Sequence, residues 1–173
     1  MSAGHMVEHS VIAGVVAPLL VLAWARLGPS GARAASNRAL SWLERPLWAW
    51  SAFVITQWVF HLTPLLEASA DDPALHTAEH LAFLAASVWF WIPVLTTGDR
   101  RLSDPERAWY LFLAAPAVDL VGAALMVRGD GGAGVVMLAG TLPIVAAAGV
   151  VTWRWLTGEE RRATAIEEAH GAL

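Results

Sequence analysis

Five long apolar segments constrain this chain more than any other feature of its sequence. A helix needs about 20 mostly apolar residues to cross the hydrocarbon core of a bilayer. Segments of that length lie near residues 6–27, 46–66, 74–97, 106–128 and 133–157. Only 15% of the residues are charged, whereas soluble domains carry about 25%. The sequence therefore predicts an all-α integral membrane bundle of five transmembrane helices.

Local signals mark where several of these helices begin and end. Asp72 followed by Pro73 has the pattern of a helix start, and Ser103 with Glu106 has the spacing of a capping box. Residues 129–134, rich in glycine, predict a tight turn before the last span. No stretch separates two domains, so we expect one transmembrane domain over residues 1–157 and a polar cytoplasmic tail over 158–173.

The placement of positive charge predicts the orientation. Every fixed positive charge is an arginine, and most arginines fall in the first loop, the third loop and the tail: Arg26, Arg33, Arg38, Arg45, Arg100, Arg101, Arg107, Arg154, Arg161 and Arg162. The positive-inside rule places these segments in the cytoplasm and the N-terminus outside. Eight tryptophans fall at the same predicted ends, as an aromatic belt would: Trp24, Trp48, Trp50, Trp89, Trp91, Trp109, Trp153 and Trp155. We expect a multi-pass protein of a bacterial plasma membrane.

Composition also excludes several classes of function. Cysteine is absent, which removes disulfides, thiolate metal sites and cysteine nucleophiles. Basic patches with interleaved aromatic residues are absent as well, so nucleic acid is not an expected partner. The apolar start lacks the positively charged region of a signal peptide, and we interpret it as a retained helix. The oligomeric state is left open.

A duplicated motif supplies the candidate chemistry. His5-Met6-Val7-Glu8-His9 and His76-Thr77-Ala78-Glu79-His80 both read H-x-x-E-H, and each opens an apolar segment at its outer end. Residues at i, i+3 and i+4 share one face of a helix, so each copy projects two imidazoles and a carboxylate in one direction. Ionisable side chains that enter a membrane are candidates for a functional site.

Other potential ligands fall in the same outer layer. His61 lies near the outer end of the second segment, and Asp119 lies within the fourth. The sequence predicts a metal site built from the following set: His5, His9, His61, His76, His80, Glu8, Glu79, Asp119, Met6 and Met137. For Asp119 a helix-packing hydrogen bond or salt bridge is an equal alternative, and Met126 and Met137 are interpreted as packing residues before ligands. His170 is interpreted as a solvated residue of the tail.

The donor types favour copper, as Cu+ or Cu2+. Imidazole suits copper, zinc, iron and nickel, and five histidines exceed what one tetrahedral zinc ion needs. The set predicts one site with spare ligands or two neighbouring sites. Haem with histidine axial ligands and zinc are the alternatives. A membrane metalloenzyme ranks last, because a zinc peptidase needs a further carboxylate ligand and has no use for a second copy of the motif. A purely structural polar network remains the fourth interpretation.

Four blocks of sequence carry a family resemblance. They are His5-Met6-Val7-Glu8-His9 with Ala17-Pro18-Leu19-Leu20-Val21-Leu22, then Phe60-His61-Leu62-Thr63-Pro64-Leu65-Leu66-Glu67, then His76-Thr77-Ala78-Glu79-His80-Leu81-Ala82-Phe83-Leu84, and finally Tyr110-Leu111-Phe112-Leu113-Ala114-Ala115-Pro116 with Asp119-Leu120-Val121-Gly122-Ala123. In order and content these blocks resemble the CtaG-type cytochrome c oxidase assembly factors. Family members carry additional spans before the first histidine block, so this chain looks like a short version.

The resemblance implies a function. It implies a non-enzymatic membrane protein that binds copper and assists its insertion into cytochrome c oxidase from the outer side. The implied partners are the lipid bilayer, oxidase subunits and a periplasmic copper donor. His5, His9, His61, His76 and His80 match the histidine positions of the family, and Asp119 matches its aspartate.

Overall fold

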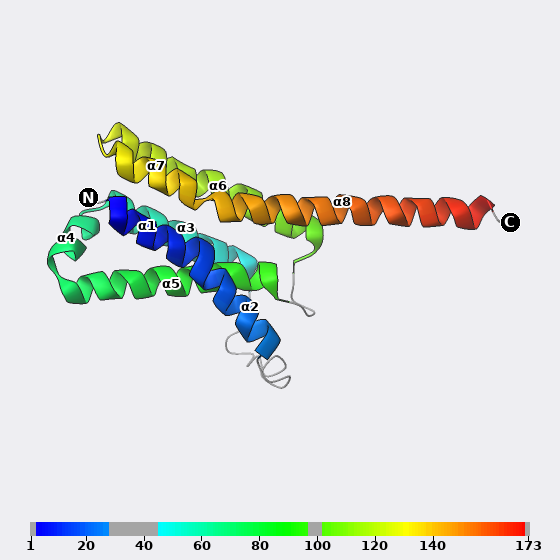
Figure 1. Cartoon of the computed structure of the whole chain (residues 1–173), viewed down its shortest axis with the longest axis horizontal. Helices are drawn as coiled ribbons and strands as arrows, with labels where there is room; N and C mark the ends of the chain where they lie inside the picture. Colours follow the sequence, from blue (N-terminus) through cyan, green and yellow to red (C-terminus); the bar gives the residue numbers. More distant parts are fainter. Residues whose placement is uncertain (1–2, 28–44, 97–101, 172–173) are drawn as a thin grey trace.

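The computed structural model describes residues 3–27, 45–96 and 102–171, and in these residues all regular structure is helical. The helices follow one another along the chain as α1 (Ala3–Val11), the π-helix η1 (Ile12–Val16), α2 (Ala17–Leu27), α3 (Pro46–Leu62), α4 (Leu65–Asp71), α5 (Pro73–Leu95), α6 (Asp104–Val127), α7 (Gly131–Gly140) and α8 (Leu142–Gly171) (Figure 1). The predicted all-helical class is confirmed. Arg33, Arg38, Arg100 and Arg101 lie outside the described residues.

Four helical stretches of the described chain are long and apolar enough to cross a membrane. They are Gly4–Leu27, Pro73–Leu95, Asp104–Val127 and Gly131–His170. The second predicted span, 46–66, differs from expectation because α3 ends at Leu62 after 17 residues. Thr63 is extended, as the residue before a proline prefers to be, and α4 then begins after Pro64. The last span is broken at Thr141, and its helix continues beyond 157 to Gly171.

The first span contains an irregularity that the sequence analysis did not predict. Within η1 the N–H of Ala17 donates to the carbonyl of Ile12, one residue further back than in an α-helix, and Pro18 has no N–H to donate. The carbonyl of Ala13 instead accepts a hydrogen bond from the indole of Trp91 in α5, at 2.8 Å. Trp91 is therefore buried in the core, and its predicted place in the aromatic belt is wrong.

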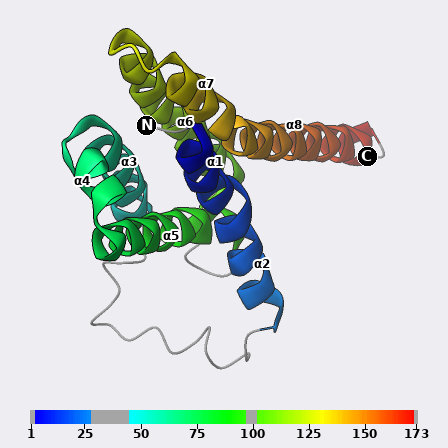
Figure 2. The same ribbon diagram turned by 60° about the vertical axis from the view of Figure 1, so that its left-hand side comes forward.

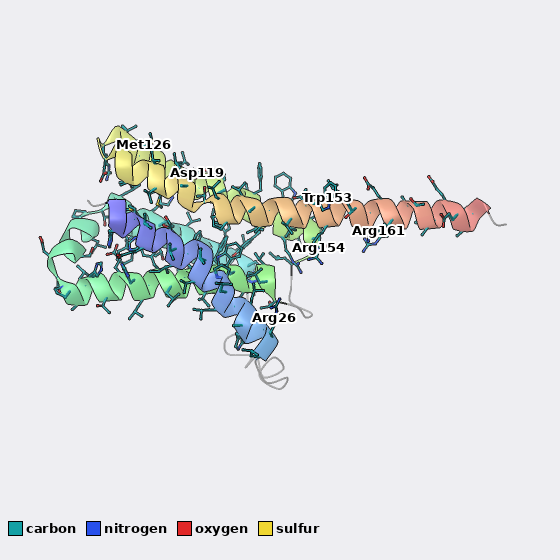
Figure 3. All side chains as sticks on the ribbon, viewed as in Figure 1. Arg26, Asp119, Met126, Trp153, Arg154 and Arg161 are labelled. Carbon is teal, nitrogen blue, oxygen red and sulfur yellow. The ribbon has the colours of Figure 1, made fainter. Side chains whose placement is uncertain are left out.

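The helices alternate in direction, so the starts of three of them gather at one end. Figure 1 shows that α1, α5 and α7 begin at the end where α3 and α6 finish. α1 lies between α5 and α7 in both views (Figures 1 and 2). At the opposite end lie Arg26, at the end of α2, and Arg154 and Arg161 along α8 (Figure 3). The core between the helices is largely aliphatic and contains one aromatic stack, with Phe90 between Phe53 and Tyr110.

Candidate metal centre

Both copies of the motif lie on helices that start at the same end of the bundle. α1 carries the first copy in its first turns, and α5 carries the second. The start of α5 is fixed by Asp72, whose carboxylate accepts from the N–H groups of Ala74 and Leu75, with Pro73 in the first turn. These signals set the register of α5 and so the direction in which its histidines and glutamate project.

The innermost carboxylate belongs to Glu79, which is completely buried. Its Oε1 atom lies 3.6 Å from Nε2 of His5 and 3.6 Å from Nε2 of His9, both on the facing helix α1. These separations exceed an ordinary hydrogen bond. Two imidazole nitrogens from one helix therefore converge on one carboxylate oxygen from the other.

The second carboxylate is placed differently, although the two motifs match in sequence. Glu8 lies 3.7 Å from Nε2 of His80, and its side chain is 58% exposed. Each helix thus presents its glutamate to imidazoles of the other helix, but only the glutamate of α5 points into the protein. The sequence alone treats Glu8 and Glu79 alike, because the motif does not reveal which residue faces the interior.

The imidazoles of the two helices form one contiguous group. Ring centroids lie 4.3 Å apart for His5 and His9, and 4.4 Å apart for His76 and His80. Across the helices, the ring of His5 lies 5.1 Å from that of His76, and the ring of His9 lies 5.0 Å from that of His80. In the structure these four histidines lie together at one end of the bundle, as the sequence predicted.

His61, on α3, contacts this group through a chain of hydrogen bonds. Its Nδ1 lies 2.7 Å from the carbonyl of Gln57, which can only accept, so this nitrogen carries the proton. In the neutral ring Nε2 is then an acceptor, and it lies 3.3 Å from Nδ1 of His9. His9 must donate through Nδ1, which leaves the lone pair of its Nε2 directed to Glu79. The ring of His9 is held further by stacking on Phe83 at 4.1 Å.

Several polar atoms of the group are buried without a hydrogen-bond partner among the described residues. They include Nε2 of His9, Nε2 of His80 and both carboxylate oxygens of Glu79. A buried carboxylate without partners is costly, and a lone pair that faces it adds repulsion. A cation between them would relieve both effects. Metal–ligand bonds of about 2.0–2.2 Å to imidazole and carboxylate can span a 3.6 Å separation, so these residues fit a metal ion.

The donor atoms fall into two overlapping groups. His5, Glu8, His76 and His80 place donor atoms within 4.8 Å of one another, and His5, His9 and Glu79 do the same. The first group is partly exposed. In the second, His9 and Glu79 are buried. His5 belongs to both.

The remaining predicted ligands, Asp119, Met6 and Met137, make other contacts in the described residues. Asp119 accepts a hydrogen bond from the hydroxyl of Thr141 at 2.9 Å, which ties α6 to the break between α7 and α8. Met6 and Met137 are buried in the apolar core, and Met137 lines a small cavity that His9 also borders. Met126 lies near the C-terminal end of α6, at the end of the bundle where α1 and α5 begin (Figure 3), and His170 is exposed on the tail. The sequence analysis missed Gln57 and Phe83, because a backbone carbonyl and a stacked phenyl ring leave no motif.

Comparison with known proteins places the described cluster within a known family. A family described as cytochrome c oxidase caa3 assembly factor (Caa3_CtaG) matches residues 1–158 of the chain. No curated protein and no solved structure matches the chain. The matched region includes both H-x-x-E-H copies, His61 and the whole buried cluster.

Proposed function

The chain belongs to the cytochrome c oxidase caa3 assembly factor family, and from this membership we propose that it binds copper at the buried histidine–glutamate cluster and assists delivery of copper to the oxidase. It acts as a carrier rather than as an enzyme. The observation that carries the proposal is Glu79, a buried carboxylate that faces two imidazole nitrogens at 3.6 Å and has no hydrogen-bond partner among the described residues.

The chemistry of the donors supports copper as the cargo. Imidazole and carboxylate bind copper well, and the chain has no cysteine to offer instead. Haem fits less well, because two axial imidazoles must stand on opposite faces of a macrocycle, whereas rings whose centroids lie 4.3–5.5 Å apart leave no space for one. Zinc uses the same donors and is distinguished from copper by metal analysis.

The exposure of the cluster supports a role in transfer. An ion that is to be handed on must be reachable, and Glu8, His80 and His5 have side chains 58%, 25% and 16% exposed. A carrier with this opening can exchange copper with a periplasmic donor and with oxidase subunits.

The placement of charge supports an orientation that leaves this opening outside. Arg26, Arg154 and Arg161 lie towards the end opposite the cluster. Arg45 and Arg107 lie at the starts of α3 and α6, which begin at that same end. The positive-inside rule then puts that end in the cytoplasm of a bacterial cell and the cluster at the outer face of the plasma membrane. In this arrangement α3 crosses as a short fifth span, since 17 residues lie at the lower limit for a transmembrane helix.

Metal analysis of the purified protein tests the proposal. We expect the wild type, purified without chelator, to hold copper. The double variant His5→Ala/His9→Ala should lose most of it, because it removes both imidazoles that face Glu79. The variant His170→Ala on the exposed tail is the matched control and should keep wild-type copper content. Full copper occupancy in the double variant, or zinc in place of copper throughout, would defeat the proposal.

A further inference from the structure

The two overlapping groups of donors differ sharply in burial, and this difference suggests an order of events. The outer group, defined as His5, Glu8, His76 and His80, borders the surface through the 58% exposed side chain of Glu8. The inner group, defined as His5, His9 and Glu79, contains side chains that are only 2% and 0% exposed at His9 and Glu79. An ion arriving from water meets the outer group first.

The groups are matched in charge and connected by one residue. Each contains a single carboxylate, so an ion that moves inward exchanges the charge of Glu8 for that of Glu79. His5 belongs to both groups, and its ring lies 4.3 Å from that of His9 and 5.1 Å from that of His76. The ion therefore need not leave one group before it reaches the other.

The two groups are not independent sites, because they share His5. An ion bound in one group therefore takes a ligand away from the other. One ion at a time is the arrangement that the donors support.

We propose that the cluster gives one copper ion two alternative positions, an outer position for capture and release and an inner position for holding, with His5 as the ligand common to both. This inference rests on the proposed function. It assigns different roles to the two groups. The outer residues control how fast copper enters, and the inner residues control how tightly it is held.

The contrast between the inner and outer donors predicts opposite kinetic effects. With Glu8→Gln/His76→Gln, the inner position is intact, so we expect one copper per chain at equilibrium but uptake at least tenfold slower. With His9→Gln/Glu79→Gln, copper is limited to the outer position, so we expect release to a chelator at least tenfold faster. A single site that uses all donors at once would instead lose equilibrium affinity to a similar degree in both variants.

The experiment uses the full chain in detergent with Cu2+ as the probe, because the donors are nitrogen and oxygen rather than sulfur. Uptake is followed after rapid mixing, release after addition of EDTA, and stoichiometry by metal analysis. Glu167→Gln/His170→Gln makes the same chemical changes on the exposed tail and should match the wild type in all three. Circular dichroism shows whether each variant has folded.

The outcomes separate this inference from the proposed function. Slow uptake with unchanged stoichiometry in the outer variant supports two positions. Equal loss of affinity in the outer and inner variants overturns them while copper binding stands. If the wild type binds no Cu2+, both the proposed function and this inference are wrong. Should the buried substitutions of the inner variant prevent folding, the outer variant decides alone: retained affinity with slow uptake supports the inference, and lost affinity overturns it.

Discussion

The hydrogen-bond chain from Gln57 through His61 to His9 fixes the orientation of the His9 ring in the candidate site. A histidine that binds a metal usually donates its other ring nitrogen to an acceptor, which fixes the tautomer and the orientation of the ring. Here His61 is that acceptor for His9, at 3.3 Å, and His61 is itself anchored to the Gln57 carbonyl at 2.7 Å. We infer that His61 positions His9 rather than binding the metal directly.

Two substitutions of His61 test this role. His61→Phe removes the acceptor and should lower the affinity for copper by about 10- to 100-fold, the usual effect of losing such a partner. His61→Gln offers an amide oxygen in its place and should recover part of the loss. Affinity is measured by competition with a coloured chelator, and the number of bound imidazoles by electron spin echo spectroscopy of Cu2+.

A direct ligand would behave differently from a positioning residue. If both variants bound one imidazole fewer than the wild type, His61 would be a ligand and the inferred role would be wrong. An unchanged imidazole count in His61→Gln agrees with the hydrogen-bond chain.

At this scale the sequence predicted residue types better than their roles. The four histidines of the two motifs gather as predicted, because helical spacing puts each pair on one face and the two faces meet. The buried position of Glu79 and the exposed position of Glu8 depend on how α1 and α5 face each other, which no local pattern specifies. The direct ligand roles of Asp119, Met6 and Met137 stay predictions. In the structure Asp119 accepts a hydrogen bond from Thr141, and the two methionines lie in the core.

Among the elements, α7 contains a glycine that packs directly against the helix of the first histidine motif. A Cβ atom added at Gly140 would lie 2.5 Å from Oγ and 3.0 Å from Cβ of Ser10. Ser10 follows His9 directly in α1, so this close approach holds α7 against the helix that carries half of the candidate metal centre.

Gly140→Ala should therefore destabilise the protein. Overpacking of this kind costs about 1–3 kcal/mol. Gly149→Ala is the matched control, because a Cβ there meets nothing within 4 Å and alanine favours a helix over glycine by about 0.5–1 kcal/mol. Unfolding in detergent, followed by circular dichroism, compares the two. Equal stability of the two variants would show that α7 does not depend on this contact.

Helix starts were predictable because their signals are local. Asp72 and Pro73 open α5, and Ser103 and Glu106 form the predicted capping box at α6. The glycine-rich turn was predicted too long, since α7 already begins at Gly131 and Gly129 alone has a positive φ, of 92°, among the described residues. The π-helix before Pro18 is stabilised by a tryptophan 78 residues away, which explains why local sequence did not reveal it.

For the whole molecule, the proposed orientation makes a prediction that the natural absence of cysteine renders easy to test. A cysteine introduced by Gly132→Cys lies near the start of α7, in open space at the end that holds the cluster. One introduced by Ala165→Cys lies on the exposed tail. A maleimide that cannot cross membranes should label the first in intact spheroplasts, and the second only after the membrane is opened. Labelling in the reverse order would contradict the proposed orientation.

The membrane-type helical bundle was predictable from the length of the apolar segments, and four of them form helices long enough to cross a membrane. The break at Thr63 and Pro64 shortened the remaining one, an effect that average hydropathy does not capture. The site could be located at one end of the bundle from the sequence, but its division into outer and inner donors required the packing of α1 against α5.

X-ray absorption at the copper edge of the copper-loaded protein tests the central claim most directly, because it reports the atoms bound to the metal. Coordination by Glu79 and by imidazoles of α1 and α5 predicts a first shell of nitrogen and oxygen, with the multiple-scattering pattern of imidazole, that is lost in His5→Ala/His9→Ala. A first shell made mainly of sulfur, or one that is the same with and without these histidines, would contradict it.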